Sequence, residues 1–430
     1  MRIFLLLLLA IFTVFLLVTI NKKNRSVGVI SGVLFSCLLY YCIVPIIFYS
    51  TPLKNPSGYV QYILRASSSD FIYAIICCLF FLVILGITYR AHRYNRSFLY
   101  KIDDLKLSRL SKKLCYICAI IGGISFILYI RAFGGVVRML AYSEYMRSFS
   151  TSGESVLTHF QTILYIPSRL VTVVPFLSLM GFNKKNLFSV SLFLVFFSLG
   201  FLFFLYDAGK IGIIIYLLSL FVPILALKTQ RPWFYVVILG MASLPIIGFL
   251  DSLFHYVSMG EWESYSDNSV LSYLQQFSYP FSNTLNLEGI ASVSGYRYGR
   301  DFITGVLNII PGVNFDVSYE PTSYFYGGST WGESGGTPND AVTFGYLQFG
   351  IIGVLFLGYL FGLITARIDN ALVRLDNTFK NNVLKASLIL LFFIITVNAD
   401  VVGVVRNQFT LTILSLLVII SSKRYRVTQN

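Results

Sequence analysis

Residues 71–113 read FIYAIICCLFFLVILGITYRAHRYNRSFLYKIDDLKLSRLSKK, an apolar run followed by a segment with eight basic residues. An apolar run of about 20 residues is long enough to cross a bilayer as a helix. Connections rich in lysine and arginine stay on the cytoplasmic side of a membrane. This stretch therefore predicts a membrane-spanning helix that ends in a cytoplasmic connection, and the same pattern recurs along the chain.

The composition of the whole chain is that of an integral membrane protein. Of its 430 residues, 56% are hydrophobic and only 12% are charged, and the mean hydropathy is +0.74. Soluble domains carry about twice that fraction of charged residues. Because the apolar runs extend from the first residue to near residue 420, no soluble domain can be separated from them. We therefore expect one all-α, polytopic membrane domain over residues 1–430.

Apolar windows of roughly 17–24 residues predict about eleven transmembrane helices. They fall at 2–20, 27–49, 71–89, 114–131, 158–181, 187–206, 211–227, 234–254, 342–365, 386–400 and 407–421. The first window resembles a secretion signal, but it lacks a cleavage site of small residues and a second span follows at once. It is therefore expected to remain as a helix.

The remaining basic residues alternate between successive spans in the same sense. The connections predicted to be cytoplasmic contain Lys22, Lys23 and Arg25; Lys184 and Lys185; Lys228 and Arg231; Arg367, Arg374, Lys380 and Lys385; and, in the C-terminal tail, Lys423, Arg424 and Arg426. The net charge of +14 then reflects membrane topology and contact with anionic lipids. Nucleic acid is not an expected partner.

Several kinds of chemistry are not supported by the sequence. There is no P-loop pattern, and the connection 90–113 is too short to fold a nucleotide-binding domain. The three histidines lack the spacing of metal ligands, so neither a metal nor another cofactor is expected. Cys115 and Cys118 form a CxxC pair without further ligands and are interpreted as packed helical thiols.

The longest polar interval, residues 255–341, is predicted to be a large loop on the outer side. It includes FYGGSTWGESGGTPND (325–340), in which aromatic rings alternate with glycines and polar groups. Aromatic faces cover the C–H faces of sugars, while carboxylates and amides bind sugar hydroxyls. The loop therefore favours carbohydrate binding. The alternative is an interfacial belt of tyrosine and tryptophan, which also forms at membrane surfaces.

Two arginines stand three residues apart in YRYGRDF (296–302). If this segment is helical, Arg297 and Arg300 share one face and could hold a diphosphate. Alternatively, they pair with Asp301 or Glu288 at the surface. The apolar FITGVLNII (302–310) is too short to cross a bilayer and is expected to lie on it or dip into it.

Arg169 lies about halfway through the fifth predicted span, just after Pro167. A charge at that depth costs about 2.5–3.5 kcal/mol, so it should face a cavity and a partner. The carbonyls that Pro167 frees could also satisfy it structurally. Two further basic residues could either bind a ligand or be merely structural. They are Lys210, in an outer turn with Asp207, and Arg406, near Asp400. By contrast, most of the three arginines of another outer loop, Arg131, Arg138 and Arg147, are expected to be solvated or to face lipid. The glycine-rich segment 345–362 is predicted to be a closely packed helix whose GxxxG serves internal packing.

YRYGRDF, the proline in NIIPG and GGTPNDAVTFGYLQFGIIGVLFLGYLFG resemble the corresponding segments of the O-antigen repeat-unit polymerases, the Wzy family. The resemblance implies a metal-independent glycosyltransferase with a GT-C-like fold, in the inner membrane of a bacterium. Such an enzyme joins undecaprenyl-pyrophosphate-linked glycans at the periplasmic face, and its C-terminus would be cytoplasmic. A chain-length regulator is a possible further partner.

The resemblance also suggests roles for individual residues. Arg169, Lys210, Arg297, Arg300 and Arg406 would converge on the phosphates. Asn339, Asp340 and Glu333 would orient sugar hydroxyls, and Asp340 or Glu333 could be the general base. The related O-antigen ligases carry a histidine where Pro338-Asn339-Asp340 stands here, which favours a polymerase and leaves the base unassigned. A ligase, a polysaccharide flippase or transporter, and a scaffold subunit are the competing interpretations.

Overall fold

The computed structural model describes residues 1–24, 28–51, 56, 58–93, 98–142, 158–181, 187–206, 210–228, 249, 252–253, 256, 270–275, 277–307, 321, 324–325, 338–373, 375, 378–401, 404 and 408–426. These residues form helices almost throughout, joined by one short antiparallel β-ribbon. Seven of the helices are long and apolar enough to cross a membrane. The chain is therefore an all-α, multi-pass membrane protein, as its composition predicts.

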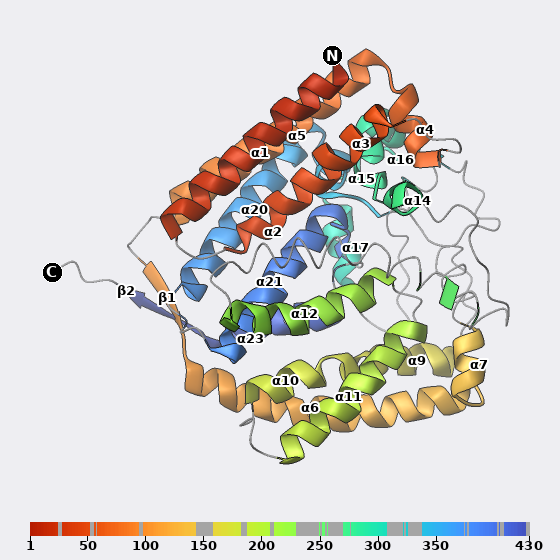
Figure 1. The fold of residues 1–430 in the computed structure, drawn as a ribbon, viewed down its shortest axis with the longest axis vertical. Coiled ribbons are helices and arrows are strands. Elements are labelled where there is room, and N and C mark those ends of the chain that lie inside the picture. The colour runs from red at the N-terminus through yellow and green to blue at the C-terminus, as the bar shows by residue number, and fades with distance from the viewer. Residues whose placement is uncertain are drawn as a thin grey trace.

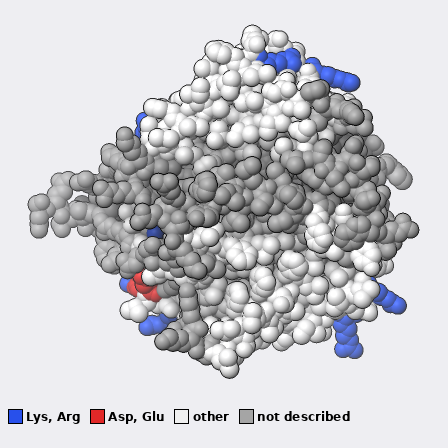
Figure 2. All heavy atoms as spheres, viewed as in Figure 1, with Lys and Arg blue, Asp and Glu red and all other residues white. Residues whose placement is uncertain are grey.

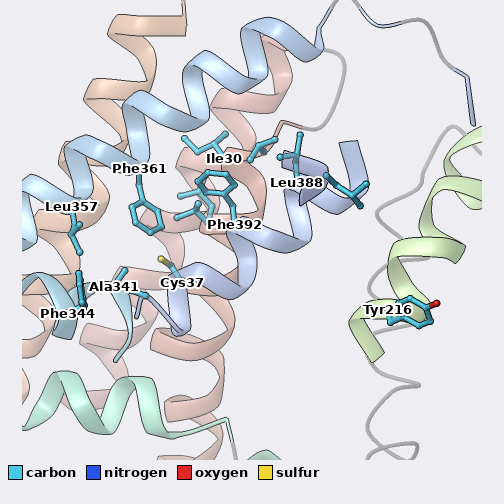
Figure 3. Close-up of a cluster of buried hydrophobic side chains, with 14 of the residues drawn as sticks. Ile30, Cys37, Tyr216, Ala341, Phe344, Leu357, Phe361, Leu388 and Phe392 are labelled. Atoms are coloured by element: carbon cyan, nitrogen blue, oxygen red, sulfur yellow. The ribbon is translucent and has the colours of Figure 1, made fainter. Parts of the chain in front are cut away.

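One group of helices comes from the two ends of the chain. It contains α1 (Arg2–Asn24), α2 (Ile30–Leu38), the π-helical turn η1 (Leu39–Ile43), α3 (Val44–Ser50), α4 (Gly58–Arg65), α5 (Ser68–Arg93), α19 (Ala341–Phe349), α20 (Ile351–Leu372), α21 (Phe379–Val397) and α23 (Phe409–Ser421). Figure 1 shows α1, α5, α20 and α2 side by side, with α21 next to α2, and the contacts between these helices agree. The core of this group is drawn in Figure 3, where Cys37, Ala341, Phe361 and Phe392 lie close together.

The middle of the chain forms a second group of helices. It contains α6 (Asp104–Ala132), α7 (Val136–Ala141), α9 (His159–Ser168), the 3-10 turn η2 (Arg169–Thr172), α10 (Val174–Gly181) and α11 (Leu187–Tyr206). In Figure 1 this group forms the layer opposite α1, and α12 (Lys210–Lys228) and α23 lie between the two groups. Contacts of α12 with α21, and of α23 with α6, join the layers.

Helices of the large loop occupy one end of the bundle. They are α14 (Val270–Gln275), α15 (Tyr279–Leu285), α16 (Leu287–Ser294) and α17 (Arg300–Leu307), and the first three lie near α4. We call this end, with α4, the outer end. The opposite end carries the ribbon of β1 (Phe98–Ile102) and β2 (Ser422–Arg426), and we call it the inner end. Two segments that are both predicted to be cytoplasmic are thus paired with each other, which agrees with their predicted location on one side of the membrane.

The predicted spans correspond closely to helices of the structure. Beyond the seven long helices, three predicted spans form shorter apolar helices, at Gly212–Pro223, Asn381–Val397 and Phe409–Ser421. The window 234–254 lies almost entirely outside the described residues. In the view of Figure 2, white side chains dominate the described surface and the few charged groups lie near its margin. An exterior with so few charged side chains suits contact with lipid.

The predicted span 342–365 is correct only in part: the candidate span is Ile351–Leu372, and residues 341–349 form a separate short helix. Helix α19 ends at Phe349, Gly350 adopts a positive φ of 60°, and α20 begins at once in a new direction. The two helices pack so closely that a Cβ on Gly345 would lie 2.8 Å from Gly353 O. Only glycine permits both the turn and this approach. The segment 341–372 is therefore a helical hairpin.

The GxxxG pair serves internal packing, as the sequence predicts. A Cβ on Gly358 would lie 2.8 Å from Phe81 O, and one on Gly362 would lie 2.7 Å from Leu85 O. Both carbonyls belong to α5, so the glycines let the backbones of α20 and α5 approach closely. All six cysteines are buried free thiols, which agrees with the interpretation of Cys115 and Cys118 as packed helical thiols.

We predict that Gly345→Ala destabilises the protein by about 1–3 kcal/mol, the usual cost of overpacking a core. The added methyl group would meet backbone atoms of α20, which cannot move aside as a side chain could. The measurement is the thermal unfolding midpoint of the purified protein in detergent. Gly123→Ala is the matched control, because a Cβ there meets only Phe196 at 3.6 Å. If both variants have the same unfolding midpoint, the close packing of α19 against α20 in the hairpin is wrong.

Candidate functional site

The two motifs that carry the resemblance are hydrogen-bonded to each other at the outer end. The first two N–H groups of the turn 297–299 donate to Leu347 O and Gln348 O, at 2.8 and 3.0 Å. The Gln348 side chain accepts from the third N–H at 3.1 Å and donates to Asp301 at 2.7 Å. These bonds satisfy carbonyls at the C-terminus of α19 that have no partner within the helix. The turn is thereby held in one position on α19.

Tyr298 adopts an unusual backbone conformation within this turn. Its φ is +50°, and the following Gly299 has a φ of +83°. Bulky residues rarely occupy this region, and those that do are held there by their surroundings. The Tyr298 side chain is 73% exposed and lies near Phe349, with 6.3 Å between ring centroids. The turn therefore presents an aromatic ring to the outside at a cost in backbone strain.

Arg297 and Arg300 are neighbours, but they do not share a helix face as the sequence analysis supposed. Arg297 lies in the turn, Arg300 begins α17, and Arg300 N donates to Arg297 O at 2.9 Å. Arg300 is exposed, whereas Arg297 is half-buried. The alternative pairing with Asp301 is wrong, because one oxygen of this buried carboxylate binds Gln348 and the other meets no donor among the described residues.

Helix α17 has an inverted distribution of polar and apolar residues. Its polar residues Asp301 and Thr304 are buried, while Ile303 is 66% exposed and Val306 is 56% exposed. A helix at a water-exposed surface would show the opposite pattern. This arrangement favours contact with lipid and agrees with the expectation that the segment beginning at Phe302 lies at the membrane.

Asp340 caps the N-terminus of α19. One carboxylate oxygen accepts from Val342 N at 3.0 Å, Thr343 N at 3.1 Å and Tyr41 OH at 2.5 Å, and the other accepts from Thr343 Oγ1 at 2.6 Å. Asp340 is fully buried, and Tyr41 lies about halfway along the span Ile30–Ser50. The hairpin therefore begins deep within the bundle. This geometry gives Asp340 a capping role, and its role as a base stays a prediction.

Asn339 joins the start of α19 to the end of α21. Its backbone N–H and its Nδ2 donate to the two oxygens of Asp400, at 3.2 and 3.1 Å, and its carbonyl accepts from Ala399 N at 2.7 Å. Asn283 of α15 donates to Pro338 O at 3.0 Å. Two helix ends and a loop helix thus meet at a buried polar junction. Asp400 is a structural partner of Asn339 that the sequence analysis did not identify.

Arg169 is buried where the fifth span is interrupted. The α-helix changes at Arg169 to the 3-10 turn η2, two residues after Pro167, before α10 continues. The guanidinium donates to Tyr165 OH and lies over the rings of Tyr165 and Phe203, at 4.6 and 5.6 Å from their centroids. Cation–π contacts of this kind stabilise a desolvated guanidinium. Arg169 thus has partners, which are aromatic among those described, and the cavity that it was expected to face stays a prediction.

The convergence of the five basic residues stays a prediction. Arg169 begins η2, between α9 and α10, whereas Arg297 is hydrogen-bonded to α19 and Arg300 begins α17. Lys210 begins α12, but its side chain lies outside what the structure describes, as do Arg406 and Glu333 entirely.

An aromatic cluster at the outer end was missed by the sequence analysis. Tyr59 and Tyr62 of α4 lie against Phe325 of the large loop, with ring centroids 5.5 and 4.7 Å apart. Tyr324 lies 6.0 Å from Tyr62 and donates from its OH to Asn286 at 3.2 Å. Burial raises the pKa of Tyr324, so it remains a neutral hydrogen-bond donor. The i, i+3 spacing of the two α4 tyrosines was the available sequence signal.

The position of α4 is set by residues from two other helices. Arg2 of α1 donates to Leu64 O at 3.2 Å and to Ala66 O, where a cation stabilises the C-terminus of α4. Tyr49 OH donates to Ile63 O at 2.5 Å. These hydrogen bonds fix the position of α4, and with it the two tyrosines that α4 contributes to the aromatic cluster.

No protein-family model matches this chain, and no curated protein or solved structure matches it either. Among the residues that the structure describes, no group of three His, Cys, Asp or Glu side chains could hold a metal ion. Any function proposed for this protein is therefore supported by the geometry of the outer end.

We predict that Asp340→Asn leaves the stability of the protein nearly unchanged, because asparagine also caps helices well. Asp340→Ala should cost about 1–3 kcal/mol, because it removes the cap and leaves buried donors without an acceptor. Thermal unfolding in detergent measures both effects. If Asp340→Ala melts with the wild type, the capping role is wrong.

Proposed function

We propose that this protein is a polymerase that joins undecaprenyl-pyrophosphate-linked oligosaccharide repeat units at the periplasmic face of a bacterial inner membrane. The observation that carries the proposal is the docking of the arginine turn 297–299 on α19. The two motifs of the resemblance, about 40 residues apart, form one unit at the outer end. A polymerase of this kind has a GT-C-like fold and needs no nucleotide.

The surface beside the arginine turn suits an amphipathic lipid carrier. Exposed Arg300 begins α17, and the exposed face of that helix contains Ile303 and Val306. A polyprenyl chain would lie along such an apolar face in the outer leaflet, while its diphosphate would meet the guanidinium. Arginine binds phosphate oxygens through two N–H groups in parallel, which suits this headgroup.

The reaction requires positive charge at the leaving group. A sugar hydroxyl of the acceptor attacks the anomeric carbon of the donor glycan, and the bond from that carbon to the diphosphate breaks. The hydroxyl proton is lost, and undecaprenyl diphosphate leaves with the bonding electrons. Arg297 and Arg300 would stabilise the charge that develops on the diphosphate. Arg169, Lys210 and Arg406 are further candidates for that role, and Glu333 or Asp340 would accept the proton.

Aromatic rings at the outer end support a carbohydrate substrate. Tyr59, Tyr62 and Tyr324 are half-buried rather than fully enclosed, and Asn286 provides a polar group beside them. Rings with polar neighbours are the usual lining of sugar sites.

We predict that Arg300→Ala reduces polymer synthesis at least about 100-fold, the usual effect of removing a group that stabilises developing charge. The purified protein would receive a synthetic undecaprenyl-diphosphate-linked repeat unit, and gel electrophoresis would measure the products. Arg138→Ala is the matched control, since Arg138 is also an exposed arginine on a short helix but belongs to α7. If the two variants are equally active, Arg300 does not belong to the site.

We predict that Arg169→Ala also abolishes polymer synthesis, and its fold must be tested separately because the residue is buried. Arg169→Lys keeps a cation near Tyr165 but loses the planar, bidentate group. If Arg169 binds phosphate, the lysine variant should melt near the wild type and still lose most activity. A stable, fully active lysine variant would leave Arg169 with a structural role only.

A transporter or flippase is a second candidate, because several helices are interrupted inside the bundle. The fifth span is broken at η2, the second contains the π-helical turn η1, and α19 starts beside the end of α21. Interrupted helices near mid-membrane are typical of transporters. A deletion strain separates the functions: loss of a polymerase leaves lipid A–core with a single repeat, whereas loss of a flippase strands repeats facing the cytoplasm. Loss of a ligase would leave unmodified core.

A further inference from the structure

A row of aromatic rings leads from α5 to the arginine turn. Tyr73 of α5 donates from its OH to Tyr346 OH of α19 at 3.3 Å. The ring of Tyr346 lies 6.0 Å from that of Tyr296, and the ring of Tyr296 lies 6.3 Å from that of Tyr298, measured between centroids. Tyr346 is buried, whereas Tyr298 at the end of the row is exposed. The inner rings thus support an outermost ring whose surface is largely accessible.

The outermost ring stands at a position where the backbone disfavours a side chain. Segment 295–299 contains three residues with a positive φ, and the two besides Tyr298 are Gly295 and Gly299. Glycine adopts such angles without strain, whereas tyrosine does not. Because Tyr298 is mostly exposed, its ring contributes little to the packing of the bundle. An exposed ring at a strained position indicates a role in binding rather than in folding.

The row of rings lies near the outer end of a span, where lipid headgroups would be. Tyr73 is five residues from the start of α5 at Ser68, which corresponds to about 8 Å along the helix. An interfacial belt would also place tyrosines at this depth. A belt can use any exposed position there, however, so it does not account for a ring at a strained one.

Tyr298 stands next to the exposed arginine that would hold the diphosphate. It precedes Arg300 by two residues, so their Cα atoms are at most about 7 Å apart. In a lipid-linked glycan, one sugar is bonded directly to the diphosphate. A diphosphate held by Arg300 would therefore bring that sugar within reach of the Tyr298 ring. Aromatic rings cover the C–H faces of sugars, so a ring at this place suits this sugar.

We propose that the Tyr298 ring binds the sugar that is bonded directly to the diphosphate of the lipid carrier. Tyr298 is thereby a specificity-determining residue, because it favours the carrier that holds a glycan over the bare carrier that remains after transfer. The arginines meet the diphosphate, which both carriers share, so they do not make this distinction. This inference rests on the proposed function and adds a sugar subsite to the same site.

The test measures how tightly the full chain, purified in detergent, binds two carriers. One is undecaprenyl diphosphate, and the other is undecaprenyl diphosphate bonded to a single N-acetylglucosamine. Microscale thermophoresis gives the dissociation constant of each. We expect the wild type to bind the glycosylated carrier about tenfold more tightly, the upper range of what one aromatic ring contact contributes.

Variants of Tyr298 separate the ring from the fold. Tyr298→Gly should bind both carriers alike, with the affinity of the wild type for the bare carrier, because the arginines remain. Glycine suits the positive φ at this position, so this variant should also melt near the wild type. Tyr298→Phe keeps the ring and should keep the tenfold preference. Tyr142→Gly is the matched control, since Tyr142 is an exposed tyrosine that follows α7, and it should leave both dissociation constants unchanged.

The inference is wrong if the wild type binds both carriers alike, or if Tyr298→Gly keeps the tenfold preference. It is also wrong if Tyr298→Gly weakens the binding of both carriers equally, because the ring would then only hold the turn at the membrane surface. Failure of the proposed function would look different. In that case neither carrier would bind the wild type, or Arg300→Ala would leave both dissociation constants unchanged.

Discussion

The structure depends on satisfying the backbone groups of helices that are interrupted inside an apolar bundle. Lipid offers no hydrogen bonds, so each free N–H or C=O in a bundle interior must find a partner within the protein. Asp340 accepts from the first N–H groups of α19, and Asp369 accepts from Val29 N, next to the start of α2, at 2.6 Å. At the other end of α19, the turn 297–299 donates to its last carbonyls. Polar side chains are buried here because the free N–H and C=O groups at helix ends need hydrogen-bond partners.

Close packing of glycines gives the arginine turn its support. Gly345 permits the contact between α19 and α20, and Gly358 and Gly362 permit the contact between α20 and α5. The short helix α19 is thus held against a long one that is itself fixed to the core. Because the turn 297–299 is bonded to α19, the position of Arg300 is determined by this packing. The geometry of the candidate site therefore depends on how the interior of the membrane domain packs.

The sequence predicted the spans well and the interruptions poorly. Hydropathy sums over windows of about 20 residues, so it identified the helix that became α5 but could not resolve the turn at Gly350 inside the window 342–365. Arg169 was recognised because a charge in an apolar window is conspicuous. Its aromatic partner Phe203 lies on another helix, and no local pattern indicates that contact. The cluster of Tyr59 and Phe325 was missed for the same reason.

The sequence by itself determined that this chain is a multi-pass, helical membrane protein, because hydropathy and charge act locally along the chain. It also determined that the GxxxG glycines pack inside the molecule. Only the tertiary structure decided that Asn339 meets Asp400, that the arginine turn is docked on α19 and that the two basic segments form one ribbon. These contacts join residues tens to hundreds of positions apart. They arise from the requirement that buried polar groups find partners, which can be met only when the whole bundle has assembled.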